Sequence, residues 1–75
     1  MMTKAEKAKK TALESFMKKI YKGIEERAAE GILSTSVMVP KGMDIFFEEQ
    51  MDKEGFLWRR EYVYNDKIEY QIIWS

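Results

Sequence analysis

The stretch that decides the fold is residues 55–74, GFLWRREYVYNDKIEYQIIW, which contains six of the ten aromatic side chains. Two runs rich in aromatic and β-branched residues, 56–64 and 68–74, flank the turn-forming residues Asn65 and Asp66. Short runs of this composition around a turn are typical of a β-hairpin. We therefore expect the chain to end in two antiparallel strands.

Two loop lengths would pair these strands differently. A two-residue loop is closed by Tyr64 and Lys67, whereas a three-residue loop is closed by Tyr64 and Ile68. A shift of one residue turns every side chain to the other face, so only one register can hold. We expect the three-residue loop, because it gathers the aromatic side chains on one face. The expected pairs are Tyr62 with Tyr70 and Trp58 with Trp74.

A long helix is expected upstream, from about Thr3 to Glu30. Its apolar residues recur at spacings of three and four, which places them on one stripe. Thr3 and Glu6 have the spacing of a capping box, and Gly31 follows where a left-handed cap favours glycine. The stripe consists of Leu13, Phe16, Met17, Ile20, Ile24 and Ala28.

A strand and a second helix are expected between the long helix and the hairpin. Residues 32–39 alternate as a half-buried strand does, and Pro40 ends the run. Helical spacing returns over residues 42–54 and stops at Gly55.

The expected fold is therefore α+β, in the order α-β-α-β-β, with a three-stranded sheet that carries both helices on one face. Ile72 and Ile73 place apolar side chains on both faces of the last strand, which favours a central position for it. We expect one domain over residues 1–75, with residues 1–12 as a protruding or frayed helix start. The expected core is Leu13, Phe16, Ile20, Ile24, Val37, Val39, Phe46, Phe47, Phe56, Trp58, Tyr70, Ile72 and Trp74.

Composition excludes several classes of function. The chain has 75 residues, 13 Lys+Arg, 13 Asp+Glu, no cysteine and no histidine. The usual general base, thiolate nucleophiles and thiolate zinc sites are therefore absent. We expect a protein that is not an enzyme and uses no cofactor and no metal. The lack of an apolar run of about 20 residues and of cysteine favours a cytoplasmic protein without membrane contact.

Charge is unevenly distributed although the total is zero. Residues 1–22 carry seven lysines and two glutamates, and residues 41–55 carry five acidic residues and two lysines. Asp44 and Glu48 lie four apart in the second helix, so we expect an acidic surface there that could dock on a basic protein. The balanced total argues against a dedicated nucleic-acid binder.

The sheet face without helices is the other candidate interaction surface. In the expected register it mixes apolar and charged side chains, a composition that small domains often bury against a partner or a second copy. Its candidate residues are Met38, Leu57, Arg59, Glu61, Val63 and Ile73.

The pattern of core and cap residues resembles a class of small uncharacterised bacteriophage proteins. The residues that carry the resemblance are Ile20, Ile24, Ala28, Gly31, Val37, Val39, Phe47, Gly55, Phe56, Trp58, Tyr70, Ile72 and Trp74. The chain departs from the class with Phe56 in place of tyrosine and Trp58 in place of valine. The resemblance implies a phage accessory protein that binds a host factor or a defence component, and it carries over no catalytic or binding residue.

Three classes of function follow from these observations. The first is a non-enzymatic protein-binding module that uses the open sheet face or the acidic second helix. The second is a nucleic-acid-binding accessory protein that uses the lysine-rich first helix with Arg59 and Arg60. The third is a small structural homo-oligomer, such as a homodimer.

Overall fold

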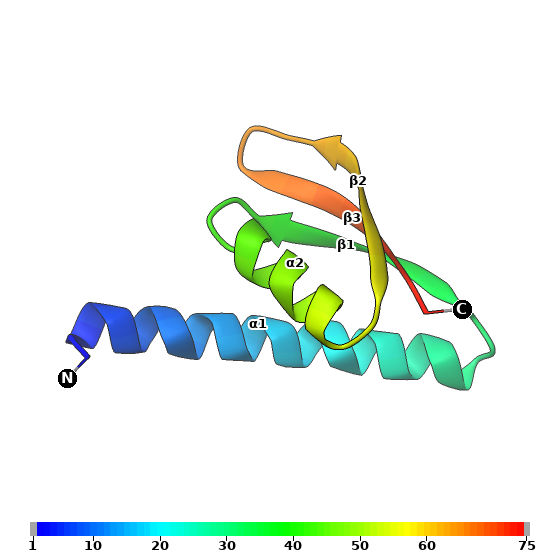
Figure 1. The fold of residues 1–75 in the computed structure, drawn as a ribbon, viewed down its shortest axis with the longest axis horizontal. Coiled ribbons are helices and arrows are strands. Elements are labelled where there is room, and N and C mark those ends of the chain that lie inside the picture. The colour runs from blue at the N-terminus through cyan, green and yellow to red at the C-terminus, as the bar shows by residue number, and fades with distance from the viewer. Residues whose placement is uncertain (1, 75) are drawn as a thin grey trace.

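The computed structural model describes residues 2–74 and contains two helices and three strands (Figure 1). The elements are α1 (Lys4–Ala29), β1 (Ser34–Pro40), α2 (Asp44–Lys53), β2 (Leu57–Val63) and β3 (Lys67–Ile73). This order confirms the expected α-β-α-β-β arrangement of an α+β fold.

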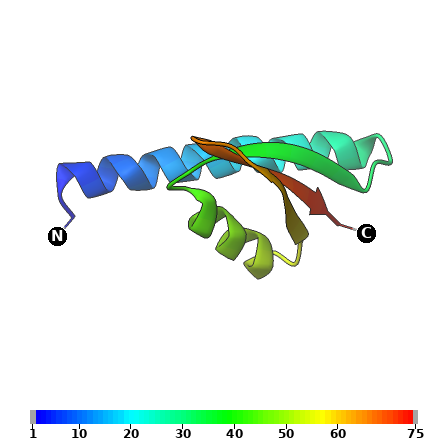
Figure 2. The ribbon, with the colours of Figure 1, turned by 90° about the horizontal axis from the view of Figure 1, so that it is seen from above.

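The sheet is antiparallel and has the order β1-β3-β2, so β3 lies between the other two strands. The central position expected for the last strand is therefore confirmed. Both helices pack on one face of the sheet and share a core with it. Figures 1 and 2 show α1 running beside β1, while α2 crosses the same face. Within residues 2–74, no helix covers the opposite face.

Hydrogen bonds at the helix ends explain where the helices begin and stop. The Thr3 side chain accepts a hydrogen bond from the Glu6 N–H at 3.1 Å, and the Thr3 hydroxyl donates to the Glu6 carboxylate. At the other end, Gly31 has φ +81° and Gly55 has φ +82°. After each helix, two backbone N–H groups bond back to the last turn, as in a Schellman motif. The expected cap and both glycine stops are confirmed.

The expected hairpin register is wrong. The Tyr64 N–H donates to the Lys67 carbonyl at 2.8 Å, which closes a two-residue loop of Asn65 and Asp66. The register then shifts at Glu61, an extra residue in β2 that forms a bulge. The observed pairs are Trp58 with Ile72, Arg60 with Tyr70, Tyr62 with Glu69 and Val63 with Ile68. Asn65 and Asp66 have no positive φ, so the loop is not one of the primed turns that match the twist of the strands. The bulge returns Trp58 to the helix-covered side, where the longer loop was expected to place it.

The core is smaller than expected and lies between α2, β3 and the middle of α1. The buried residues are Met17, Ile20, Ile24, Val39, Phe47, Met51, Ile68, Tyr70 and Ile72. Met17, Met51 and Ile68 were not in the expected core, although Met17 belongs to the expected apolar stripe of the long helix. Leu13, Phe16, Val37, Phe46, Phe56, Trp58 and Trp74 are only half-buried. Ala28, which the apolar stripe included, is exposed.

The first turns of α1 extend past the sheet (Figure 1). Residues 4–12 are helical, and their side chains are exposed. Between residues 2 and 74, neither helix combines the length and the apolar character that a bilayer crossing requires.

The cap after α2 generates a stability prediction. Because Gly55 has φ +82°, we expect Gly55→Ala to lower the free energy of unfolding by about 1–2 kcal/mol. Gly55→Asn should cost less, since asparagine tolerates this conformation better. Urea unfolding followed by tryptophan fluorescence measures both variants. Equal stability of the alanine and wild-type proteins would contradict this account of the cap.

Candidate functional site

The uncovered face of the sheet forms a grid of three rows across the strands. Strand pairing places Ser34, Ile73 and Leu57 in the first row, Ser36, Gln71 and Arg59 in the second, and Met38, Glu69 and Tyr62 in the third. We call these nine residues the outward face. The outer strands lie about 10 Å apart, and the rows extend over about 13 Å.

Large apolar side chains are exposed at both ends of the outward face. Leu57 is 62% exposed in the first row, and in the third row Tyr62 is 59% and Met38 is 43% exposed. The Tyr62 ring packs at a tilt against Tyr64, with ring centroids 4.6 Å apart, which extends the aromatic surface toward the hairpin loop. The two apolar ends are therefore the parts of this face that would gain most from being covered.

A polar row separates these apolar ends. The Arg59 guanidinium donates to the Gln71 side-chain oxygen at 2.5 Å and to the Glu61 carboxylate at 2.6 Å. The contact with Gln71 crosses from β2 to the central strand β3, whereas the contact with Glu61 stays within β2. Together they hold the Arg59 side chain along the sheet. This row would therefore present polar groups in fixed orientations to a binding partner, between the two apolar ends of the face.

Five of the six residues expected on this face lie there, and Val63 does not. Met38, Leu57, Arg59 and Ile73 belong to the outward face, and the Glu61 side chain reaches it through its contact with Arg59. Val63 pairs with Ile68, a buried residue on the helix-covered side. The bulge at Glu61 causes the difference, because each residue of β2 after it points to the opposite face from the one that simple alternation predicts. Tyr62 therefore lies on the outward face in place of Val63, and the sequence pattern did not indicate this change.

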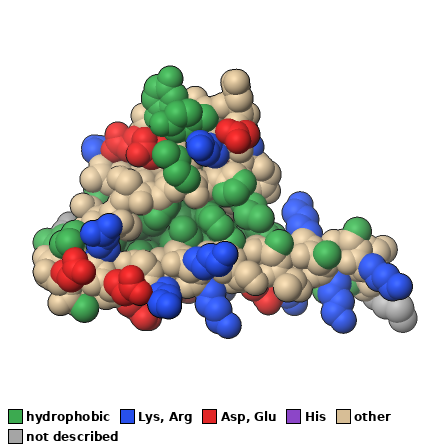
Figure 3. All heavy atoms as spheres, turned by 180° about the vertical axis from the view of Figure 1, so that it is seen from behind, with side chains coloured by type: hydrophobic (Ala, Val, Ile, Leu, Met, Phe, Trp, Pro, Cys, Tyr) green, Lys and Arg blue, Asp and Glu red, His purple; other side chains and the backbone are tan. Residues whose placement is uncertain are grey.

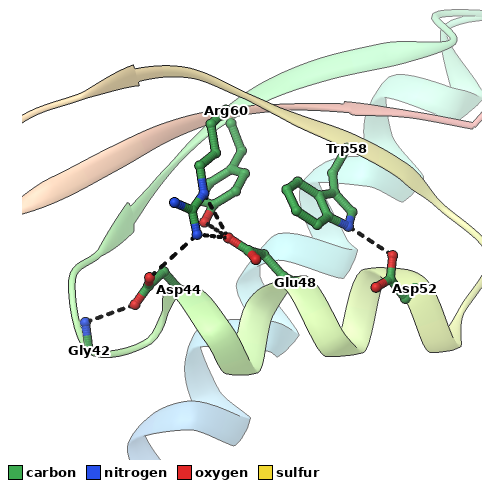
Figure 4. A network of polar contacts seen from close by, with 7 residues as sticks. Gly42, Asp44, Glu48, Asp52, Trp58 and Arg60 are labelled. Carbon is green, nitrogen blue, oxygen red and sulfur yellow. Dashed lines mark hydrogen bonds and ion pairs between the residues drawn. The ribbon is translucent and has the colours of Figure 1, made fainter.

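The two acidic residues expected to form a free surface on α2 instead contact the sheet (Figure 4). Glu48 Oε2 accepts hydrogen bonds from Arg60 Nε at 2.9 Å and from Arg60 Nη2 at 2.6 Å. The same oxygen accepts a hydrogen bond from the Tyr70 hydroxyl. Asp44 Oδ2 lies 3.8 Å from Arg60 Nη2, and Asp44 Oδ1 accepts a hydrogen bond from the Gly42 N–H at 3.2 Å.

These contacts turn the acidic cluster into a link between α2 and the hairpin. The Glu48 side chain is only 14% exposed, and the Arg60 guanidinium balances its charge. The expectation of a solvated acidic surface at Asp44 and Glu48 is therefore wrong. Sequence reasoning missed it because Arg60 belongs to another element, and the observed register places Arg60 opposite Tyr70, beside Glu48.

Aromatic packing supports the same link. The Tyr70 ring packs against Phe47 and Trp58, with centroids 4.7 and 5.8 Å away. Trp58 Nε1 donates to the Asp52 carboxylate at 2.9 Å. Burial, followed by the hydrogen bond to Glu48, raises the pKa of the Tyr70 hydroxyl well above its usual value. Burial and the nearby charge of Glu54 also raise the pKa of Tyr21.

The exposed lysines lie mostly on α1. Figure 3 shows basic side chains along the part of this helix that extends beyond the sheet. Lys4, Lys7, Lys9 and Lys10 are all exposed there. This end of the molecule is basic, and Figure 1 shows it away from the β2–β3 hairpin that carries Arg59 and Arg60.

Residues 2–74 contain no group of three or more acidic side chains placed to hold a metal ion. Comparison with protein-family models, with curated proteins and with solved structures finds no match for the chain.

The Tyr70 hydroxyl generates a prediction on stability and pH. Its folded-state pKa lies above the unfolded value of about 10, so its contribution to stability is complete below pH 10 and is lost as the pH rises further. Tyr70→Phe should therefore lose less stability than the wild-type protein when the pH rises above 10. At pH 7 it should cost about 1.5–3 kcal/mol, because a hydrogen bond to a charged group is lost.

Urea unfolding from pH 7 to pH 11 measures both effects. The matched control is Tyr62→Phe, which deletes an exposed hydroxyl and should leave the pH profile unchanged. An unchanged alkaline profile in Tyr70→Phe would contradict the role given to this hydroxyl.

Proposed function

We propose that the chain is a small non-enzymatic protein-binding module and that the outward face is its binding surface. The observation that carries the proposal is the exposure of Leu57, Met38 and Tyr62 on a sheet face that no helix covers. Tyrosine, methionine and arginine are enriched where proteins bind one another. Burying these side chains against a partner would remove apolar surface from water.

The alternative surface on α2 is the weaker candidate. A basic partner would require free carboxylates, but Asp44 and Glu48 already face Arg60. Removing Glu48 from this contact would leave the guanidinium and the Tyr70 hydroxyl without their acceptor. A partner could cover the apolar ends of the outward face without breaking these hydrogen bonds.

The resemblance to small bacteriophage proteins supports a protein of the host cell as the partner. A phage accessory protein would meet a host factor or a defence component in the cytoplasm of the infected cell. A single outward face is small beside the roughly 800 Å² that each partner contributes to a standard interface. The partner is therefore expected to contact the rim of the sheet as well.

A second candidate function rests on the exposed lysines of α1. Four lysines within residues 4–10 could contact phosphates without reading sequence. Submicromolar binding to generic DNA that falls steeply between 50 and 200 mM salt would favour this function over protein binding. The zero net charge of the chain favours the opposite result.

The binding surface can be tested by capture from a bacterial host lysate followed by mass spectrometry. We expect Leu57→Lys and Tyr62→Lys each to abolish capture of the partner that wild-type protein retains, because a charge would be buried in the interface. The matched control is Ile45→Lys on α2, where the side chain is 58% exposed but lies off the sheet. This variant should capture the partner normally.

The proposal fails if both sheet variants retain the same protein at wild-type levels. It also fails if Ile45→Lys loses the partner equally, since capture would then follow general surface hydrophobicity. Far-ultraviolet circular dichroism of each variant separates loss of binding from loss of folding.

A further inference from the structure

The two edges of the sheet are built differently. β2 carries the bulge at Glu61 and the charged residues Arg59 and Arg60, features that discourage pairing with another chain. β1 pairs with β3 without a register shift, and residues 34–39 contain no charge, no glycine and no proline. Pro40, which has no N–H to donate, ends this strand. The edge of β1 is therefore the open edge of this sheet.

Backbone hydrogen bonds show which groups of β1 are directed away from the sheet. The Trp74 N–H donates to the Leu33 carbonyl, and the Lys41 N–H donates to the Asp66 carbonyl, each at 3.0 Å. In an antiparallel pair, alternate residues direct both backbone groups to the same neighbour. The odd-numbered residues of β1 therefore face β3, and Ser34, Ser36 and Met38 direct their N–H and C=O groups outward.

A groove of about 420 Å³ lies beside this edge, between β1 and α1. Ile20 and Gly23 of α1 and Val37 of β1 contribute to its walls. A side chain at Gly23 would have open space, since a Cβ atom there meets nothing within 4 Å. In Figure 3, hydrophobic side chains line the hollow between α1 and the sheet.

The two ends of the groove carry opposite charge. Lys19 lies toward one end, and Glu26, Arg27 and Glu30 lie toward the other, which gives the second end a net charge of −1. Because β1 runs opposite to α1 (Figure 1), a strand added antiparallel to β1 would run in the direction of α1. Its N-terminal part would meet Lys19, and its C-terminal part would meet the glutamates.

We propose that the open edge of β1 binds an extended peptide segment of a partner protein, which adds a fourth, antiparallel strand to the sheet. The segment has an acidic residue, a small apolar residue and a basic residue at alternate positions, from its N-terminus to its C-terminus. Its backbone pairs with Ser34, Ser36 and Met38, and its own acidic, small apolar and basic side chains enter the groove beside α1.

The spacing of the groove charges agrees with this pattern. Lys19 and the midpoint of Glu26 and Glu30 are nine residues apart on α1, which corresponds to about 13 Å. Four residues of an extended strand span about 13 Å, and residues four apart face the same side. The central residue of the segment then lies near Gly23, where only a small side chain is needed.

A single extended segment occupies no more space than the groove beside β1. A second copy of the chain that paired through the same edge would also bring its own α1 to this edge, so a peptide segment is the better occupant. The inference concerns the β1 edge and not the outward face, and therefore stands or falls separately from the proposed function.

The test uses a capped peptide of sequence Thr-Asp-Thr-Ala-Thr-Lys-Thr and isotope-labelled full-length protein. Titration followed by amide chemical shifts should perturb residues 34–38 and the groove-lining part of α1, and leave β2 unchanged. Gly23→Leu should abolish binding by filling the groove, while the protein remains folded because leucine favours the helix.

Charge exchange gives the second test. Lys19→Glu, at an exposed site, should weaken binding of this peptide roughly two- to fivefold. The same variant should favour the swapped peptide Thr-Lys-Thr-Ala-Thr-Asp-Thr, which has the same composition. Unchanged preference between the two peptides would contradict the assigned direction and chemistry.

Three results would overturn the proposal. The first is no shift at millimolar peptide, and the second is a set of shifts confined to β2. The third is concentration-dependent shifts at Ser34, Ser36 and Met38 without peptide, together with a dimer mass by light scattering. That last result would assign the edge to a second copy of the chain.

Discussion

The bulge at Glu61 is the constraint on which the rest of the structure depends. One extra residue in β2 lets the hairpin close with a two-residue loop and still places Trp58 and Arg60 on the helix-covered side. Arg60 can then reach Glu48 on α2, and the Tyr70 hydroxyl bonds to the same carboxylate. Without this register shift, α2 would lose its polar link to the sheet.

The same bulge sets the two surfaces that are left for binding. It turns Tyr62 to the outward face beside Glu69, where the side chain is largely exposed. It also disrupts the β2 edge, so that β1 is the edge with a regular row of free backbone groups. A module of 75 residues thereby offers an uncovered face and an open edge, while its buried side chains maintain the fold.

Local signals were sufficient to predict the elements. Helical spacing, the Thr3 cap and the glycines at 31 and 55 each act within a few residues, so a single sequence records them. The central position of β3 was also predictable, because Ile72 and Ile73 are apolar on opposite faces. These features locate the candidate face to within a few residues.

Non-local pairing could not be predicted in the same way. A bulge has no strong sequence signal here, since Glu61 stands in a run of charged and aromatic residues that suits either register. The fate of Asp44 and Glu48 depended on that register, because their partner Arg60 belongs to another element. Acidic residues on a helix therefore suggested a free surface where the structure has an ion pair.

The most direct test of the account is a nuclear Overhauser measurement of the hairpin register in solution. Hα protons approach closely in the non-hydrogen-bonded pairs of an antiparallel sheet. The account predicts strong Hα–Hα contacts between Arg60 and Tyr70 and between Trp58 and Ile72. Contacts between Tyr62 and Tyr70 would contradict it, because that register has no bulge. It would turn Tyr62 away from the outward face and pair Arg60 with Ile72 in place of Tyr70.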